Sequence, residues 1–439
     1  MTLPRLKKNQ SVIYTKEISG EKIQAHGYRK YPFLTQRVWS YVTLGLSAFC
    51  LVLVILLGMS NSQLISPLMD PLHSLTKTQV KNSGHEVFGF GPYWTINKLD
   101  NVDFNVLTTF SYFGVPVLGD GSLDRSDNGY TVFQGKKATE IFKKAHAHGT
   151  RVVLTLTQMD NDTLDSLLSD NQAQSNAINE AVSEVKNRGI DGINVDFEYV
   201  GNPGSEERTA FSNFVKNLTT KMHQEVPSSK VTVYVYASAA TSNRLTDITA
   251  LAKNSDGIFM MAYDFAVANS EIAMPTAPLY GKKEGKYSYD VSTAVDDFLA
   301  KMPANKLILG VPYYGYNYMV SKPGANVPTL PPLGTAQTVE YASENIEATQ
   351  SGWDETSEVG WKAYYDAPNG VWRVLYQDDA KSLGIKYDYA LSKNLGGVGI
   401  WALGFDNGTN NLWAVLQDKF GSKNIADARI VNRSINESE

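Results

Sequence analysis

Four polar residues that could carry chemistry lie within one short β-type segment, GIDGINVDFE at 189–198. Side chains alternate between the two faces of a strand, so Asn194, Asp196 and Glu198 should point the same way. Neighbouring carboxylates raise each other's pKa, and a glutamic acid with a raised pKa suits general acid catalysis near neutral pH. The alternative is a set of strand-end polar groups bonded to backbone or water, although an inward ladder of such groups is costly to bury. We therefore expect acid–base chemistry centred on Glu198.

The elements that must position this segment alternate between short β-branched or aromatic runs and helical patterns, which indicates βα units and a parallel sheet. The predicted strands are 87–93, 107–113, 151–157, 189–197, 230–236, 257–263, 306–313 and 397–403, and the clearest helices are 136–148, 205–226 and 291–302. Eight strands in this order predict an α/β fold, a closed (β/α)8 TIM barrel with Glu198 at the C-terminal mouth of the fourth strand. An open doubly wound sheet is the alternative, but no G-x-G-x-x-G follows the first strand.

The gap of 315–395 between the seventh and eighth strands is too long for one crossover helix. It contains Trp353, Trp361, Trp372 and a cluster of tyrosines. We expect a small α+β insertion at 317–377, with a helix resuming near Asp379.

The N-terminal part of the chain differs in charge from the rest. Residues 1–37 hold eight basic and two acidic side chains, and 38–69 hold no charge at all. The mostly apolar residues 38–59 would reach roughly 33 Å as a helix, enough to cross a bilayer. The basic residues before this span predict a cytoplasmic tail at 1–37, a transmembrane helix at 38–59, a stalk at 60–84, an extracellular barrel at 85–420 and a polar tail at 421–439. A cleaved signal peptide and a buried soluble helix are the alternatives.

The charge balance, the cysteine count and the absence of certain motifs exclude several other classes of function. The 40 Lys+Arg against 45 Asp+Glu argue against a general nucleic-acid-binding surface. The one cysteine, Cys50, falls in the predicted span, so neither a disulfide framework nor a Cys-based zinc site is expected. His146 and His148 are two apart and do not share a helix face, and the chain has no H-E-x-x-H or G-x-S-x-G. We expect no metal, no cofactor and a monomer.

Four motifs together resemble glycoside hydrolase family 18, the chitinase-like barrels. The segment at 189–198 is similar to the family's D-x-x-D-x-D-x-E signature, with Asn194 where many members have Asp, as in the bacterial spore-cortex and cell-wall N-acetylglucosaminidases of the family. Met261-Ala-Tyr263-Asp264 matches M-x-Y-D, LGVPYYG at 309–315 matches L-G-[IV]-P-[FY]-Y-G, and GGVGIW at 396–401 matches G-[GA]-[VIM]-x-x-W. Taken singly, the three later motifs could be ordinary core strands.

The resemblance implies a retaining, substrate-assisted hydrolysis of glycans that contain N-acetylglucosamine, an exception to the scheme with two enzyme carboxylates. Glu198 would be the acid and base, Asp196 would orient the substrate acetamido group, and Tyr263 would bond its carbonyl. Trp401 would form an apolar floor under the sugar. The remaining expected substrate-binding or supporting residues are Asp191, Asp264, Met261 and Tyr313.

Three positions call for separate expectations. The amide of Asn194 should donate to Asp196 and lower its pKa relative to a second anion there, which alters the pH profile. The family's S-x-G-G on strand three is replaced by LTQMD at 156–160, which changes the cleft wall. Tyr93, with Trp94 beside it, should either stack on sugars or pack under the insertion.

The sequence thus predicts a membrane-anchored bacterial glycosidase that cleaves β-1,4 links next to N-acetylglucosamine in peptidoglycan, chitin or another extracellular glycan. Its alternatives are a non-catalytic glycan-binding protein and an envelope morphogenesis protein on the same barrel, because a fold does not fix a function.

Overall fold

The computed structural model of the protein describes residues 84–421, apart from 243, 407 and 409. Outside the described residues lie the predicted cytoplasmic tail at 1–37 and the predicted transmembrane helix at 38–59. Of the predicted stalk at 60–84 only residue 84 is described, and of the predicted polar tail at 421–439 only residue 421. Within the described part of the chain, no helix has the length and apolar character that a bilayer span requires.

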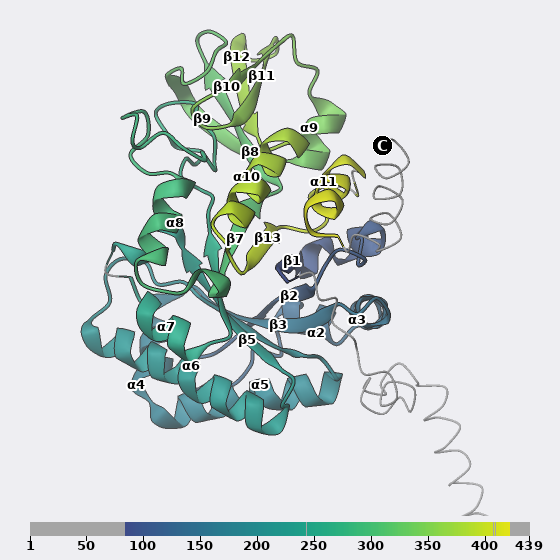
Figure 1. The fold of residues 1–439 in the computed structure, drawn as a ribbon, viewed down its shortest axis with the longest axis vertical. Coiled ribbons are helices and arrows are strands. Elements are labelled where there is room, and N and C mark those ends of the chain that lie inside the picture. The colour runs from purple at the N-terminus through teal and green to yellow at the C-terminus, as the bar shows by residue number, and fades with distance from the viewer. Residues whose placement is uncertain (1–83, 243, 407, 409, 422–439) are drawn as a thin grey trace, which may run out of the picture. The chain divides into compact units, whose positions relative to one another are not determined.

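Eight parallel strands close into a barrel, which confirms the predicted fold class (Figure 1). Its strands are β1 (Glu86–Pro92), β2 (Thr109–Pro116), β3 (Arg151–Gln158), β4 (Gly192–Phe197), β5 (Lys230–Tyr236), β6 (Gly257–Met261), β7 (Leu307–Pro312) and β13 (Gly397–Trp401). Each strand pairs with its neighbour in chain order, and β13 closes the barrel against β1. The predicted bounds of β5 agree with the structure at both ends.

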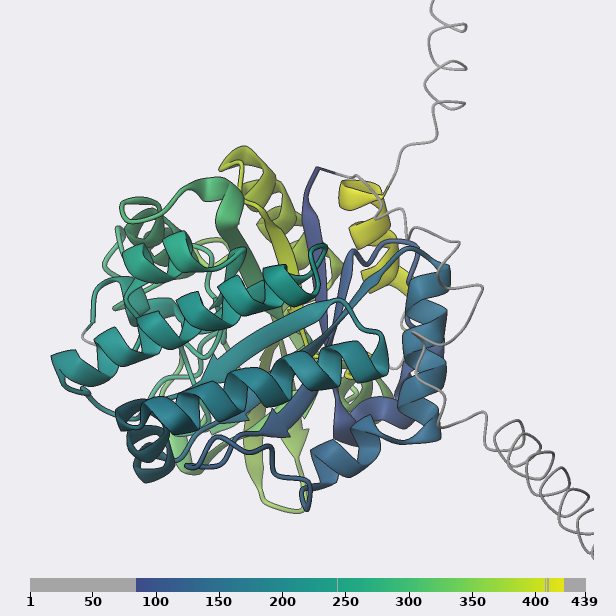
Figure 2. The same ribbon diagram turned by 90° about the horizontal axis from the view of Figure 1, so that it is seen from below.

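Helices connect the strands and cover the outside of the barrel (Figure 2). They are α2 (Asn128–Phe133), α3 (Lys136–Ala147), α4 (Asn161–Ser169), α5 (Asn171–Arg188), α6 (Ser205–Glu225), α7 (Ile248–Asn254), α8 (Val291–Leu299), α10 (Ala380–Ser392) and α11 (Asn410–Phe420), with 3-10 turns η2 (Tyr93–Asn101), η3 (Ala237–Ala240) and η4 (Ala304–Lys306). Aspartates cap several of them. Asp379, for example, forms a capping box with Ser382 at the start of α10, where the sequence predicts that a helix resumes.

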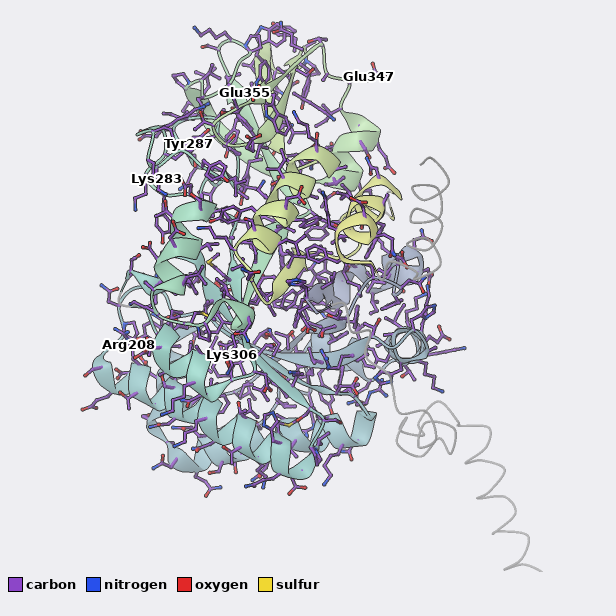
Figure 3. All side chains as sticks on the ribbon, viewed as in Figure 1. Arg208, Lys283, Tyr287, Lys306, Glu347 and Glu355 are labelled. Carbon is purple, nitrogen blue, oxygen red and sulfur yellow. The ribbon has the colours of Figure 1, made fainter. Side chains whose placement is uncertain are left out.

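The inserted segment forms an antiparallel sheet of five strands with order β10-β11-β12-β8-β9. Its elements are β8 (Tyr314–Val320), β9 (Thr329–Thr338), α9 (Val339–Asn345), β10 (Gln350–Asp354), β11 (Val359–Asp366) and β12 (Val371–Gln377). Tyr287, labelled in Figure 3, lies on the loop before α8 and donates to Asp354 of β10 at 2.8 Å, and Lys286 pairs with the same carboxylate at 2.6 Å. These contacts attach the sheet to the β6–α8 loop of the barrel.

The strand that carries the predicted signature is built as its alternation requires. Gly189 ends α5 in the left-handed region at φ 60°, where glycine carries little strain, and the chain then enters β4. Phe197 faces outward and stacks on Phe214 of α6, with the two ring centres 5.6 Å apart. Asn194 and Asp196 point the other way and are almost completely buried inside the barrel. The outward face therefore anchors the strand, and the inward face carries its polar groups.

Candidate active site

A cavity of about 760 Å³ opens at the C-terminal end of the barrel strands. It is lined by Tyr93, Trp94, Phe113, Gly114, Pro116, Asp127, Thr157, Met159, Asp196, Glu198, Tyr234, Tyr236, Ala237, Ser238, Arg244, Met261, Tyr263, Asp264, Phe265, Tyr289, Tyr314 and Trp401. Its volume lies within the range of ligand sites in proteins, and catalytic residues of TIM barrels gather at this end of the strands. Seven of the ten residues proposed from the sequence line it.

Glu198 follows the last residue of β4, and its backbone N–H donates to the carbonyl of Gln158 at 2.9 Å. Its carboxylate accepts a hydrogen bond from the hydroxyl of Tyr236, the last residue of β5. This contact follows from the strand register, because β4 and β5 pair with an offset of 38 residues, as in Asn194 beside Thr232. The side chain is therefore held at the cavity wall by the neighbouring strand.

Burial raises the pKa of Glu198, and the negative charge of Asp264 raises it further, whereas the hydrogen bond from Tyr236 lowers it in part. The pKa of Asp196 lies well above its ordinary value, mainly because of burial and also because of the charge on Glu198. Asp196 is thus suited to remain protonated while Glu198 exchanges a proton. Two carboxyl groups two residues apart, at the end of β4 and just after it, both with raised pKa values, form a candidate acid–base centre.

Two residues at the cavity wall carry buried polar atoms without a hydrogen-bond partner in the described part of the chain. In Asp196 these atoms are the two carboxyl oxygens, and in Tyr263, which follows β6, the atom is the hydroxyl oxygen. Buried polar groups are normally paired, so unpaired ones that line a cavity are available to a ligand. These atoms are the clearest sign that the cavity receives a molecule with matching donors and acceptors.

Asp264 also reaches the cavity but is held by its neighbours. Its Oδ1 accepts hydrogen bonds from the hydroxyls of Tyr314 at 2.5 Å, Tyr316 at 3.0 Å and Thr276 at 3.2 Å. Its backbone lies at φ 57°, a region that non-glycine residues enter at a cost and that often marks a functional site. Asp264 supplies a fixed negative charge near Glu198 rather than a mobile carboxylate.

The floor and one side of the cavity are aromatic. The ring of Trp401, at the end of β13, lies 4.7 Å from Phe113, 6.1 Å from Tyr234 and 6.5 Å from Trp94. Trp94 remains 52% exposed although it lines the cavity, and Tyr93 packs edge-on against it at 4.9 Å. Exposed aromatic faces of this kind can stack on the apolar faces of sugar rings.

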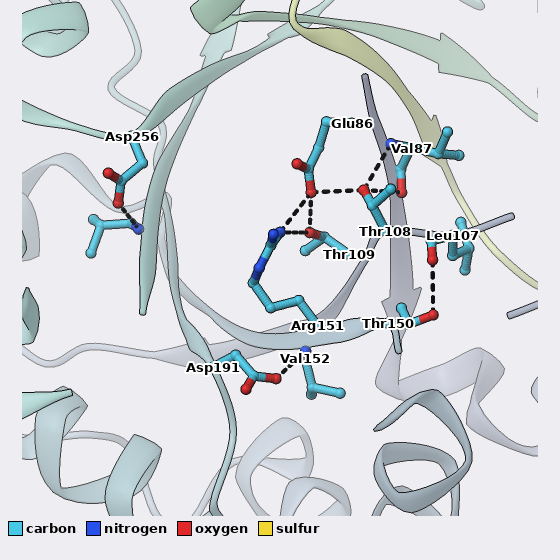
Figure 4. A network of polar contacts seen from close by, with 11 residues as sticks. Glu86, Val87, Leu107, Thr108, Thr109, Thr150, Arg151, Val152, Asp191 and Asp256 are labelled. Carbon is cyan, nitrogen blue, oxygen red and sulfur yellow. Dashed lines mark hydrogen bonds and ion pairs between the residues drawn. The ribbon is translucent and has the colours of Figure 1, made fainter. Parts of the chain in front are cut away.

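Three residues proposed from the sequence do not line the cavity, namely Asp191, Tyr313 and Asn194. Tyr313 is completely buried in the core and does not line the cavity, whereas the next residue, Tyr314, does. Asp191 lies at the opposite, N-terminal end of the barrel, where it accepts a hydrogen bond from the backbone N–H of Val152 at 2.7 Å (Figure 4). The same carboxylate lies 2.7 Å from Nε2 of His146. The expectation that Asp191 and Tyr313 belong to the substrate site is therefore wrong.

Asn194 lies one layer below the cavity, and its expected contact is not made. Its Oδ1 accepts from the hydroxyl of Thr232 at 2.9 Å. Neither its Nδ2 nor the carboxyl oxygens of Asp196 find a partner among the described residues, so the predicted hydrogen bond to Asp196 is absent. The pKa of Asp196 is raised by burial even without a second carboxylate at position 194.

Sequence reasoning missed several cavity residues, above all Tyr236 and Arg244. The alternation within the predicted strand 230–236 places Thr232, Tyr234 and Tyr236 on one face, which was a usable signal. Arg244 follows η3 on a loop, and no periodic pattern could have placed it. The replaced strand-three motif contributes Thr157 and the half-exposed Met159 to the wall. Among the described residues, no cluster of His, Cys, Asp and Glu is arranged to hold a metal ion.

Known proteins resemble this chain in sequence and in fold. The family model described as "Glycosyl hydrolases family 18" matches residues 78–406. Di-N-acetylchitobiase from Homo sapiens is 28% identical over 313 residues, covering 65% of this chain and 77% of that protein. Cortical fragment-lytic enzyme from Bacillus subtilis (strain 168) is 24% identical over 313 residues, covering 69% and 67%. The solved structure of a GH18 chitinase from Cycas revoluta in complex with (GlcNAc)3 has a TM-score of 0.66 at 22% identity, covering 76% of this chain and 100% of that one.

Proposed function

This chain belongs to glycosyl hydrolases family 18 and is a glycosidase, and we propose that it cleaves β-1,4 bonds next to N-acetylglucosamine by a retaining, substrate-assisted mechanism. Glu198 is the acid and base in this scheme, and the substrate's own acetamido group is the nucleophile. The names of the relatives from Homo sapiens and Bacillus subtilis, and the bound (GlcNAc)3 of the Cycas revoluta chitinase, support a glycan of this class.

The proposal rests on buried polar atoms that share a cavity with Glu198 and have no hydrogen-bond partner among residues 84–421 as far as they are described. Asp196 and Tyr263 present buried carboxyl and hydroxyl oxygens to the same cavity that Glu198 lines. An acetamido group offers one N–H donor and one carbonyl acceptor. The N–H suits a carboxyl oxygen of Asp196, and the carbonyl oxygen suits the hydroxyl of Tyr263. Both bonds would hold the carbonyl oxygen in position to attack the anomeric carbon, which is catalysis by positioning.

The remaining carboxylates support a mechanism without an enzyme nucleophile. Asp196 is buried and its pKa lies well above the ordinary value, so it favours the protonated, weakly nucleophilic form. Oδ1 of Asp264 accepts three hydrogen bonds, which tie up its lone pairs. Glu198, with a raised pKa, is then the group suited to protonate a leaving oxygen near neutral pH.

The proton and electron pairs balance over two steps. Glu198 gives its proton to the glycosidic oxygen, the bond from that oxygen to the anomeric carbon breaks, and the acetamido oxygen bonds to the same carbon to form an oxazolinium ion. Glu198, now a carboxylate, takes a proton from a water molecule, whose oxygen attacks the anomeric carbon. The bond from the acetamido oxygen to that carbon breaks, so the oxazolinium ring opens. Glu198 ends protonated as it began. Trp401 supports the apolar face of the sugar throughout.

The test is hydrolysis by the purified full chain of chitin hexaose and of peptidoglycan strands freed of peptide, with products identified by mass spectrometry. We expect shorter oligomers that carry N-acetylglucosamine at the new ends, and a loss of at least a hundredfold in Glu198→Gln. Glu140→Gln is the matched control, because Glu140 is an exposed residue of α3 whose one ion pair among the described residues is with Lys136 at 3.8 Å. Equal activity of Glu198→Gln and the control contradicts the proposal.

The location of the enzyme is a separate proposal that rests on the sequence. Residues 38–59 would anchor the chain, with 1–37 in the cytoplasm and the barrel outside a bacterial cell. Protease added to intact cells should then release the barrel, and a tag at residue 1 should stay protected. Release of both ends, or of neither, contradicts this topology.

A further inference from the structure

Arg244 is the only positively charged residue among the described residues that line the cavity, whereas the lining holds four carboxylic acids, Asp127, Asp196, Glu198 and Asp264. No carboxylate in the described part of the chain forms an ion pair with Arg244. Charged side chains that are partly removed from water are usually paired. A half-buried guanidinium without an anionic partner therefore keeps its N–H donors for a ligand.

The position of Arg244 relates it to the bond that is cleaved. Its Cζ lies 4.9 Å from the centre of the Tyr236 ring, and the hydroxyl of that tyrosine donates to Glu198. Ala237 and Ser238, which follow β5, line the cavity on the same side. Arg244 is thus separated from the acid by the width of one side chain, so a group that it binds lies on a sugar close to the scissile bond.

The chemistry of the guanidinium selects the kind of group. A polymer of N-acetylglucosamine alone carries hydroxyl and acetamido groups but no charge, so it offers a guanidinium only neutral acceptors. A guanidinium forms two parallel hydrogen bonds to a carboxylate and is the side chain best matched to it. A carboxylate on the glycan would therefore give Arg244 the anionic partner that the described cavity wall does not provide.

We propose that Arg244 binds a carboxylate on the glycan next to the cleaved bond, and that the preferred substrate is an acidic N-acetyl glycan. A strand of alternating N-acetylglucosamine and N-acetylmuramic acid with a free lactyl carboxylate has this chemistry. The inference rests on the proposed function and names its substrate class. Arg244 is then a specificity-determining residue, and it takes no part in the proton transfers of Glu198.

The experiment compares three substrates with the purified full chain. The first is a set of peptide-free glycan strands with free lactyl carboxylates, the second is the same strands with those carboxylates converted to methylamides, and the third is chitin hexaose. The first two differ only where one carboxylate oxygen is replaced by an N-methyl amide nitrogen, which removes the charge, so their ratio of kcat/KM isolates the carboxylate. We expect a ratio of about ten or more in favour of the charged strands, mainly through KM.

Arg244→Gln should reduce that ratio roughly tenfold, and Arg244→Lys should keep part of it because the charge remains. Lys216→Gln is the control. Lys216 is exposed on α6, outside the cavity, and its substitution by glutamine removes the same single positive charge. An equal loss on all three substrates in Arg244→Gln, or a ratio near one in the unchanged chain, overturns the inference while leaving the hydrolase intact. Absence of hydrolysis on every substrate instead overturns the proposed function itself, and the inference with it.

Discussion

The hydroxyl of Tyr236, the last residue of β5, donates a hydrogen bond to Oε2 of Glu198, which follows β4. Burial raises the pKa of this glutamic acid, and the hydrogen bond offsets part of that rise by stabilising the carboxylate. Glu198 must be protonated for the first step and ionised for the second. The pair of side chains is therefore arranged to keep both forms accessible.

Removing the hydroxyl in Tyr236→Phe should raise the pKa of Glu198, because the carboxylate loses its donor. The basic limb of the kcat/KM profile, which reports loss of the proton from the free enzyme's acid, should shift to higher pH. Tyr289→Phe is the control, since Tyr289 also lines the cavity but donates to Asp297 at 2.7 Å. A basic limb that stays in place in Tyr236→Phe, or that moves equally in both variants, contradicts the assigned role of Glu198.

Asp196→Asn should abolish most activity and change how stability depends on pH. The folded-state pKa of Asp196 lies above its unfolded value, so its contribution to stability is fully present below about pH 4 and is lost as pH rises through the folded pKa. Asparagine does not titrate, so the melting temperature of the variant relative to the unchanged chain should increase as pH rises above about 4. Calorimetry between pH 4 and 8 measures this. A difference that is constant or decreases with pH shows that Asp196 is not a carboxyl group with a raised pKa.

Tyr263→Phe should lower kcat by about a hundredfold, the scale of losing one oriented donor, with little change in KM. The hydroxyl has no partner among the described residues, so its loss should not lower the melting temperature. Tyr387→Phe is the matched control, because Tyr387 is a fully buried tyrosine outside the cavity. Kinetics on chitin hexaose and thermal unfolding of both variants provide the measurements. A destabilised Tyr263→Phe with normal kcat indicates a structural role instead.

Asn194→Asp should place a second carboxyl group beneath Asp196, in a layer of the barrel that is closed to solvent. The new group must bury a charge or remain protonated, so we expect a loss of about 1–3 kcal/mol of stability at neutral pH that diminishes under acidic conditions. The added charge should also raise the pKa of Asp196 and displace the pH–rate curve. Urea unfolding at pH 5 and 7 and a pH–rate profile test both effects. If both limbs of the curve remain where they were, position 194 does not influence the acid–base centre.

Period-two alternation and strand order carried much of the prediction. The inward direction of Asn194 and Asp196 needs only the pleat of β4, and the mouth position of Glu198 needs only that β4 is a barrel strand. The same alternation places Asp191 on the other face from Glu198, and the structure indeed puts it at the far end of the barrel. Its assignment to the site came from the motif alone and was wrong.

Other contacts depend on geometry that one strand cannot encode. The contact of Glu198 with Tyr236 requires the register between β4 and β5, which is set by the whole barrel. Tyr313 lies between the end of β7 and the start of β8, where the chain changes sheet, so alternation does not decide whether it or Tyr314 faces the cavity. Arg244 reaches the cavity from an irregular loop. Its role is visible only when the charges of the assembled wall are compared.

In the proposed mechanism the substrate's acetamido group, and not an enzyme carboxylate or a directly attacking water, forms the bond to the anomeric carbon in the first step. Proton NMR of the first products released from chitin hexaose, recorded before mutarotation, tests it most directly. We expect the new reducing end to appear as the β-anomer, and we expect no cleavage of a hexamer whose acetamido groups have been removed. An α-anomer as the first product, or cleavage of the deacetylated hexamer at a similar rate, would contradict it.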